Sequence, residues 1–275
     1  MIGQGALSTQ QSSLAKSLEK LSTGLRINRA SDDAAGLSVS ESLRSKIRGM
    51  DRAKSNAGDG IALIQIAEGS AGQINDILQR MRELSIQSAT DTMTTTERSY
   101  TNKEFGQLMS EITRISSSAN YNGMTLLDGA AGSFGVSGGA SSVLHIGAGS
   151  STSVDRISVT VNSMTLGALG LNATTTAVST STSALASLAL IDTAIKSVNT
   201  MRSDMGAYVN RLEFAMSNLE NQVYNTQDAE SRIRDVDFAK ETTEFTRSQI
   251  LSQSATSMLA QANQVPQGVL ALLGR

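Results

Sequence analysis

The feature that most restricts how this chain can fold is a heptad repeat in its C-terminal third. Apolar side chains recur every seventh residue, and a companion apolar series, interrupted only at Arg202, lies between them. These alternating steps of three and four residues place the apolar side chains on one stripe of an α-helix, and another helix must cover that stripe. The main series is Ile191, Val198, Met205, Leu212 and Leu219. We therefore expect residues 187–226 to form one helix of roughly 60 Å, at 1.5 Å per residue.

The N-terminal half carries stripes with the same kind of spacing. Residues 53–87 hold the clearest one, and residues 95–118 are expected to form a shorter helix that stops at the turn-forming sequence SSANYNG. The stripe within 53–87 includes Ile64, Ile74, Leu78 and Met81. Each of these helices needs a partner to bury its apolar face.

Both ends of the chain are also expected to be helical. After the sequence DAESRIRDVD, a last helix is predicted to run to about residue 263 and to pack through Phe245 and Leu259. The only proline, Pro266, lies where breaking a helix costs least. Near the N-terminus, helical steps relate the packing candidates Leu14, Leu18, Leu21 and Leu25. We predict that the N- and C-terminal thirds pair antiparallel.

Residues 125–185 follow a different pattern. The segment begins rich in Gly and Ser, and the sequence RISVTVNSMTL then alternates apolar and polar residues as a β-strand does. Low-complexity sequence follows in NATTTAVSTSTSA, which we interpret as a surface loop whose Ser and Thr residues are exposed. This segment is therefore expected to be a small β-rich insert.

Composition supports helices rather than a thick rounded core. Only 3% of the residues are aromatic, there is no Trp, and aromatic side chains supply much of the packing in compact cores. The predicted fold class is mainly α: an elongated antiparallel helical bundle or coiled coil of N- and C-terminal helices with a small β-rich insert.

Several function classes are disfavoured by the same residues. The net charge of −2 gives no general attraction to nucleic acid or to acidic membranes, and the absence of Cys excludes disulfides and thiolate chemistry. One histidine, His145, cannot supply a His-rich metal cluster, and the dispersed serines show no triad order. We expect no enzyme activity, no cofactor, no metal, no nucleic-acid partner and no membrane span. The start lacks the pattern of a signal peptide, so export would use a route without a cleaved signal.

One stretch, RASDDAAGLSVSE, could still carry chemistry through its adjacent carboxylates. Asp32 and Asp33 could form a metal site or an acid/base pair, or they could begin a helix. The helix start is favoured, with Ser31 or Asp32 as the cap and Asp33 stabilised by the positive end of the helix dipole. The small residues 34–36 would keep that turn thin, so that another helix could approach.

Several motifs, in order along the chain, resemble bacterial flagellin. They include LSTGLRINRASDDAAGLSVSESLRSKIRGM near the N-terminus, with ESRIRDVDFAKE and ILSQSATSMLAQANQVPQGVLALL near the C-terminus. The resemblance implies an inner helical domain from 1–30 and 236–275, connecting spokes from 31–52 and 227–235, and an outer rod from 53–226. It implies a short form without large variable outer domains.

The resemblance also implies a function. Such a chain is expected to polymerise with itself into the extracellular flagellar filament, and to meet an export chaperone and the cap and junction proteins. A flagellin-like junction protein between hook and filament is the alternative, because such proteins share the terminal helices.

The family further carries a surface for the innate immune Toll-like receptor that detects flagellin. Its contact motif aligns with LQRMRELSIQ, which places the matched positions at Arg80, Leu84 and Glu104. The alternative interpretation is structural: Leu84 would pack beside the seam, and Arg80 and Glu104 would pair between helices.

Overall fold

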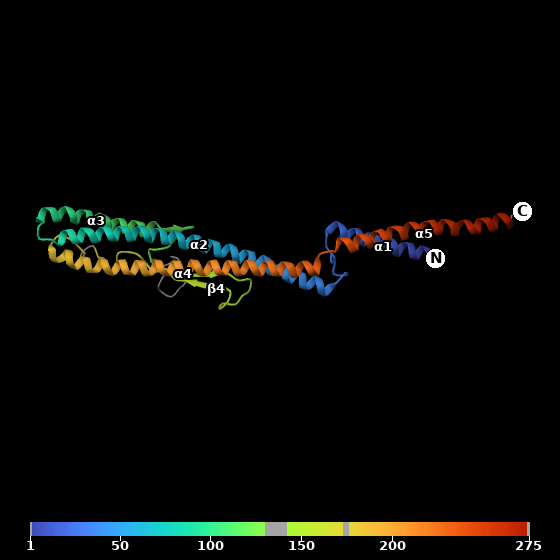
Figure 1. Ribbon diagram of the computed structural model, residues 1–275, viewed down its shortest axis with the longest axis horizontal. Helices are drawn as coiled ribbons and strands as arrows, with labels where there is room; N and C mark the ends of the chain where they lie inside the picture. The colour runs from blue at the N-terminus through green and yellow to red at the C-terminus, as the bar shows by residue number, and fades with distance from the viewer. Residues whose placement is uncertain (1, 130–141, 173–175, 274–275) are drawn as a thin grey trace. The chain divides into compact units, whose positions relative to one another are not determined.

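The computed structural model describes residues 2–129, 142–172 and 176–273, with side chains described between residues 4 and 262. These residues form five helices and four short strands (Figure 1). The chain divides into two compact units, one of residues 1–48 with 223–275 and the other of residues 49–222. The helices are α1 (Ile2–Thr23), α2 (Ala34–Ala89), α3 (Thr95–Ser118), α4 (Ser181–Arg234) and α5 (Phe238–Leu273). The strands are β1 (Asn120–Tyr121), β2 (Met124–Thr125), β3 (Ser142–His145) and β4 (Arg156–Val159).

In the unit of residues 49–222, α2, α3 and α4 lie side by side around one core (Figure 1). Within this unit, three ion pairs join α2 to α4. The residue numbers of the α4 partners decrease as those of the α2 partners increase, so the two helices are antiparallel. The pairs are Lys54–Glu220 at 2.8 Å, Glu68–Arg202 at 3.4 Å and Arg82–Asp192 at 2.7 Å. The predicted class, a mainly α antiparallel bundle with a small β-rich insert, is confirmed.

The heptad residues are buried, as their spacing predicted. All of the following are buried: Ile64, Ile74, Leu78, Met81, Ile191, Val198, Met205, Leu212 and Leu219. The helix α3 packs on a second flank of α2, since Phe105, Met109 and Ile112 belong to the same core. The face of α2 toward α4 and its face toward α3 are therefore both buried within this unit.

The local sequence explains how α3 begins and ends. The Thr94 hydroxyl accepts a hydrogen bond from the Glu97 backbone N–H, and the Glu97 carboxylate accepts one from the Thr94 backbone N–H at 2.7 Å. This capping box satisfies two donors that would otherwise lack partners. After α3, the β1–β2 hairpin turns through Asn122 and Gly123, which have φ of 50° and 79°. Asn-Gly is the residue pair that tolerates positive φ at both turn positions.

A second hairpin, β3–β4, pairs Ser142 with Val159 and His145 with Arg156. It docks on α2, because Asn56 donates a hydrogen bond to the His145 carbonyl at 3.1 Å and the Leu144 side chain lies over Gly60. The alternating stretch at 156–161 was expected to be a strand, and its first four residues are β4. The remainder of the expected β-rich segment includes residues 130–141 and 173–175, which lie outside the described residues.

The segment NATTTAVSTSTSA was predicted to be an exposed surface loop, and this prediction was only partly right for its described residues. Asn172, Ser179, Thr180 and Thr182 are exposed, but α4 already begins at Ser181. Thr176, Val178 and Ala184 are buried. The Val178 backbone N–H donates to Asn102 Oδ1 at 3.0 Å, and Ser187 Oγ donates to the Ala177 carbonyl at 2.9 Å. Side chains of neighbouring helices thus satisfy the backbone, which removes the usual reason for a polar segment to stay in water.

In the unit of residues 1–48 and 223–275, α1 packs antiparallel to α5. The pairing continues beyond α1 as an isolated antiparallel bridge between Leu25 and Asp235, beside which Arg26 Nη2 donates to the Ile233 carbonyl at 2.5 Å. Arg234 is buried and its Nη1 lies 2.6 Å from Glu41 Oε1. This hydrogen bond is the main reason that the pKa of the Glu41 carboxyl is lowered.

Several helix boundaries differ from those expected from apolar spacing. The stripe expected over residues 53–87 belongs to a longer helix that begins at Ala34, where the adjacent aspartates predicted a helix start. The helix expected over residues 187–226 spans Ser181–Arg234. The last helix does not end near residue 263 but continues through Pro266 to Leu273. A proline removes one backbone donor and crowds only the preceding turn, and the Val, Leu and Ala residues that follow it here are compatible with a helix.

Candidate functional site

The Arg80 guanidinium forms the centre of an exposed charged cluster on α2 and α3. Its Nε and Nη2 donate to Glu104 Oε1 at 3.1 and 2.9 Å, and its Nη1 donates to Glu83 Oε2 at 3.0 Å. These hydrogen bonds, first the one to Glu104 and then the one to Glu83, raise the pKa of Arg80 above its ordinary value. The structure therefore brings together two of the three residues expected at a receptor surface.

The third residue, Leu84, lies elsewhere. Its side chain is 2% exposed and belongs to the same buried cluster as Met81 and Phe105. Packing of α3 on the flank of α2 covers this position, as the structural interpretation of the sequence allowed. Leu84 therefore cannot contact a partner directly while this unit is folded.

The seam between α1 and α5 alternates small residues with larger apolar ones. Ser17 of α1 and Ser248 of α5 are buried, whereas Leu18 is 50% exposed. The other predicted packing residues of this unit are half-buried, namely Leu14, Leu21, Leu25, Phe245 and Leu259. Leu14, Leu21 and Phe245 lie three or four residues from the buried serines and therefore share their helix face. Leu18 alone among the predicted packing residues of this unit is exposed.

One face of α5 carries apolar residues that were not among the predicted site residues. Ile250, Leu251 and Met258 are all exposed, and Ile250 and Met258 line a shallow groove of about 410 Å³ with Gln253, Ser254 and Ser257. Exposed large apolar side chains gathered on one helix face make this face the candidate interaction surface of the unit. The signal in the sequence was the seven-residue spacing of Leu251 and Met258, which continues a stripe along α5.

The adjacent carboxylates of Asp32 and Asp33 have separate structural roles. Asp33 Oδ1 accepts from the Gly36 backbone N–H at 2.8 Å and caps α2, so the cap is neither Ser31 nor Asp32. Asp32 Oδ2 accepts from the backbone N–H groups of Arg29 at 3.0 Å and of Asn28 at 3.3 Å. These bonds, the one from Arg29 above all, lower the pKa of the Asp32 carboxyl. Within the described residues, no group of three or more His, Cys, Asp or Glu side chains could hold a metal ion.

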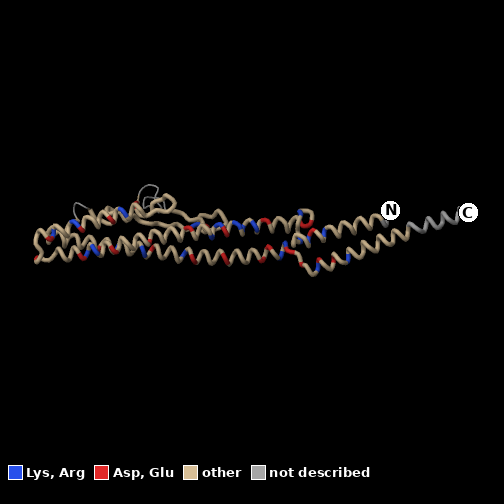
Figure 2. The backbone as a smooth tube through the Cα atoms, turned by 90° about the horizontal axis from the view of Figure 1, so that it is seen from above, with Lys and Arg blue, Asp and Glu red and all other residues tan. Residues whose placement is uncertain are grey.

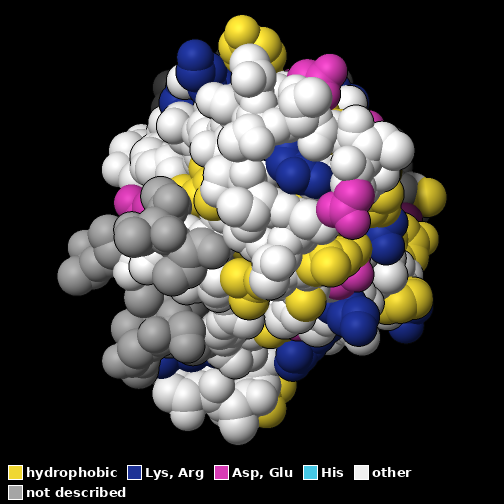
Figure 3. Space-filling model, turned by 90° about the vertical axis from the view of Figure 1, so that its left-hand side faces the viewer, with side chains coloured by type: hydrophobic (Ala, Val, Ile, Leu, Met, Phe, Trp, Pro, Cys, Tyr) yellow, Lys and Arg dark blue, Asp and Glu magenta, His cyan; other side chains and the backbone are white. Residues whose placement is uncertain are grey.

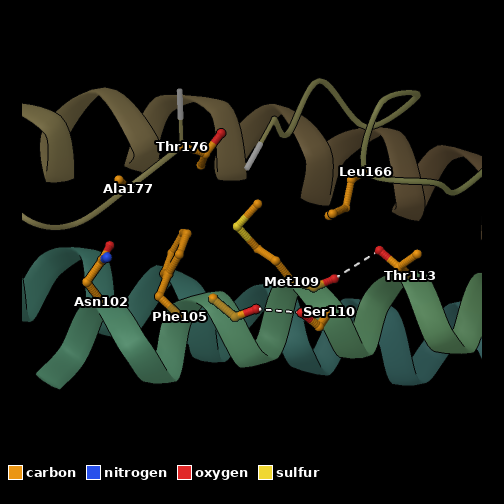
Figure 4. A pocket seen from close by; sticks show the side chains of 9 residues that line it. Asn102, Phe105, Met109, Ser110, Thr113, Leu166, Thr176 and Ala177 are labelled. Carbon is orange, nitrogen blue, oxygen red and sulfur yellow. Dashed lines mark hydrogen bonds between the residues drawn. The ribbon is translucent and has the colours of Figure 1, made fainter. Parts of the chain in front are cut away.

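A small pocket of about 170 Å³ lies between α3 and the segment that carries Leu166 and Thr176. Phe105 and Met109 point from α3 toward that segment, and Asn102 lies at one end (Figure 4). None of the described residues that line it is ionisable. The pocket therefore offers no general acid or base.

The helices carry both signs of charge along their lengths (Figure 2). Figure 3 shows the end at which α2 turns into α3, where small hydrophobic clusters lie between charged and uncharged polar groups. No helix among the described residues is long and apolar enough to cross a membrane. These features define a helical-bundle protein whose candidate functional residues lie on exposed helix surfaces.

Comparison with known proteins places the chain more narrowly. Residues 1–131 match the bacterial flagellin N-terminal helical region, and residues 188–273 match the bacterial flagellin C-terminal helical region. The flagellar filament 33 kDa core protein of Treponema phagedenis is 44% identical over 282 residues, which cover 99% of this chain and 96% of that protein. The chain belongs to the bacterial flagellin family, a family of structural proteins.

Solved structures agree with this fold. The crystal structure of Bacillus cereus flagellin is 27% identical with a TM-score of 0.51, and the match covers 60% of this chain and 88% of that one. A Vibrio parahaemolyticus structure described as a flagellar hook-associated protein has a TM-score of 0.60 at 16% identity, covering 74% of this chain and all of that one. At that identity the second match shows a shared fold alone.

Proposed function

We propose that this chain polymerises with copies of itself into the flagellar filament that drives swimming. The observation that carries the proposal is the apolar face left uncovered on α5 by Ile250, Leu251 and Met258. Exposed Leu18 adds an apolar side chain on α1, the partner helix of α5. Membership of the flagellin family supports a second copy of the chain as the occupant of this face.

The proposal assigns each segment a role. Residues 1–30 and 236–275 form the inner domain around the filament channel, residues 31–52 and 227–235 are spokes, and residues 53–226 form the outer rod. The subunit works outside the cell without catalysing a reaction. An export chaperone, the filament cap and the junction proteins are its further partners.

Electron microscopy of the purified protein tests polymerisation directly, because a filament subunit forms long filaments under assembling conditions. Ile250→Asp and Leu251→Asp should abolish filaments while leaving the helical content unchanged, since each puts a charge into the face that copies bury. Ile250→Leu keeps the apolar area and is the matched control. Filaments of normal length from both aspartate variants would contradict the assignment of this face.

The alternative function is that of a junction protein between hook and filament, and the fold shared with a hook-associated protein is what keeps this alternative open. The two functions differ in the length of the assembly. Short oligomers that persist under every assembling condition would favour the junction protein, whereas long filaments would favour the filament subunit.

A second proposal concerns the exposed cluster of Arg80, Glu83 and Glu104. We propose that the flagellin-sensing Toll-like receptor of a host recognises this surface on the unassembled chain. An arginine with two glutamates in fixed positions offers a partner both a donor and acceptors. Leu84 supports the surface from beneath by packing in the core.

Receptor signalling by purified variants tests this second proposal. Arg80→Ala and Glu104→Ala should each lower signalling while the melting temperature changes little, because both side chains are about half exposed. Leu84→Ala serves as the contrasting variant, since it should lower signalling only as far as it unfolds the unit. Unchanged signalling from an Arg80→Ala, Glu104→Ala double variant would refute the site.

A further inference from the structure

The thioether of Met258 lies in an unusual position for a methionine of this chain. Its side chain is 70% exposed on α5, more than that of any other methionine among the residues with described side chains. The next most exposed methionine side chain is that of Met124, on β2, which is 39% exposed. Six others are buried, namely Met50, Met81, Met109, Met164, Met201 and Met205.

We propose that Met258 is an oxidation site of the unassembled chain, and that its sulfoxide prevents polymerisation. The second half of this proposal rests on the proposed filament function. The reagent is a hydroperoxide such as hydrogen peroxide. The sulfur lone pair attacks one oxygen of hydrogen peroxide and forms the S–O bond as the O–O bond breaks. The proton on the attacked oxygen passes to the departing hydroxide, which leaves as water. Sulfur is oxidised by two electrons and the peroxide is reduced by two.

Exposure determines which methionine reacts, because the oxidant must reach the sulfur. The core methionines are enclosed by the packing of α2, α3 and α4, so their oxidation requires that unit to open. Met258 needs no opening. Its neighbours in the shallow groove, Ile250, Gln253, Ser254 and Ser257, leave the sulfur accessible and include no basic or acidic group.

The change in polarity explains the effect on assembly. A thioether is apolar and adapts to irregular apolar surfaces, whereas a sulfoxide carries a strong hydrogen-bond acceptor. In the apolar face with Ile250 and Leu251, that oxygen would be removed from water when a second copy docks. The Ser257 hydroxyl is a poor substitute for water, because its Oγ already donates to the Gln253 carbonyl at 3.0 Å. Burial of a polar atom without a partner disfavours association.

The experiment treats full-length protein with hydrogen peroxide before assembly and maps oxidised methionines by peptide mass spectrometry at several times. Met258 should gain one oxygen several-fold faster than Met124 and well before the buried methionines. At the time when Met258 is fully oxidised and the others are largely intact, sedimentation should show most of the protein in the supernatant. Treatment with methionine sulfoxide reductases should return it to the pellet.

Three variants separate oxidation of Met258 from damage elsewhere. Met258→Leu should polymerise normally after peroxide, Met124→Leu should remain as sensitive as the unaltered chain, and Met258→Gln should polymerise poorly without any peroxide. Equal oxidation rates at Met258 and Met109 would overturn the site, and normal polymerisation of fully oxidised Met258 protein would overturn its effect. Untreated protein that never polymerises would instead refute the filament function, and the mass map would still decide where oxidation occurs.

Discussion

The Asp33 carboxylate accepts a hydrogen bond from the backbone N–H of Gly36 at 2.8 Å, and this bond begins the longest helix of the described chain, α2. A side chain at position 36 would crowd this turn, because its Cβ would meet the Asp33 carboxylate and would lie 2.8 Å from Ile27 Cδ1, so that one of them would have to shift. The close neighbour of this thin turn is thus the buried Ile27 side chain rather than a second helix.

The first prediction concerns this cap. Asp33→Ala should lower the free energy of unfolding by about 1 kcal/mol, because the first turn of α2 loses its acceptor. Asp33→Asn keeps an acceptor at the same place and should stay within a few tenths of a kcal/mol of the unaltered protein. Guanidinium denaturation followed by circular dichroism measures both, and equal losses in the two variants would contradict a capping role.

The second prediction compares two glycines of α2. Gly58→Ala should stabilise the protein by about 0.5–1 kcal/mol, because nothing lies within 4 Å of the added Cβ and alanine favours a helix. At Gly60 the added Cβ would lie 2.5 Å from Leu144 Cδ1. Gly60→Ala should therefore be less stable than Gly58→Ala by about 1–3 kcal/mol, the usual cost of overpacking. Equal stabilisation by both would mean that the β3–β4 hairpin does not rest on α2 there.

The third prediction tests the heptad core. Leu212 is fully buried, so Leu212→Asp should destabilise the unit of residues 49–222 by at least about 3 kcal/mol through an unpaired buried charge. Phe214→Asp, two residues further along α4, is the matched control. Its side chain is 77% exposed, and the change should remain within about 0.5 kcal/mol. Thermal melting of the two variants distinguishes them.

The fourth prediction concerns the loss of stability at acidic pH. Hydrogen bonds from the Thr94 backbone N–H and then from its hydroxyl lower the pKa of the Glu97 carboxyl below its ordinary value of 4.5. A lowered folded-state pKa means that the unfolded chain binds the proton first. The contribution of Glu97 to stability is therefore present above pH 4.5 and is lost as the pH falls through the folded-state value.

Melting temperatures measured between pH 7 and pH 3 check this expectation. Glu97→Gln should fall less steeply with acid than the unaltered protein, since the amide does not titrate. A Glu97→Gln profile parallel to that of the unaltered chain would show that the capping box does not respond to pH.

Apolar spacing predicted much of this fold. The steps of three and four in α2 and α4 identified buried seam residues such as Ile74 and Leu212, because every apolar side chain on such a stripe must be covered. Burial on the flanks of these helices was harder to predict. Burial of Leu84 depends on α3, and burial of Thr176 depends on packing from residues distant in the sequence, so neither follows from local periodicity.

The terminal helices show a different limit. Leucine spacing in α1 predicted a leucine seam, and the half-buried Leu14 and Leu21 do lie on it, but the buried position between them is Ser17, and Leu18 faces outward. Leu18 directly follows Ser17, and leucine identity alone does not say which of two neighbouring positions meets the partner helix. For the candidate receptor surface, the family resemblance pointed to Arg80 and Glu104, and the structure shows the hydrogen bonds between them.

The bond between Arg26 and the Ile233 carbonyl joins residues 207 positions apart in the chain. On a ribosome, Arg26 emerges long before its partner exists, and the unit that contains both can close only after Ile233 and α5 have been made. Contacts of such long range are slow to form because a large loop must first be closed. The unit of residues 49–222, whose segments are nearer in sequence, can fold earlier. We therefore expect the unit of residues 1–48 and 223–275 to fold after the unit of residues 49–222, with the seam side chains of α1 and α5 left in water until then.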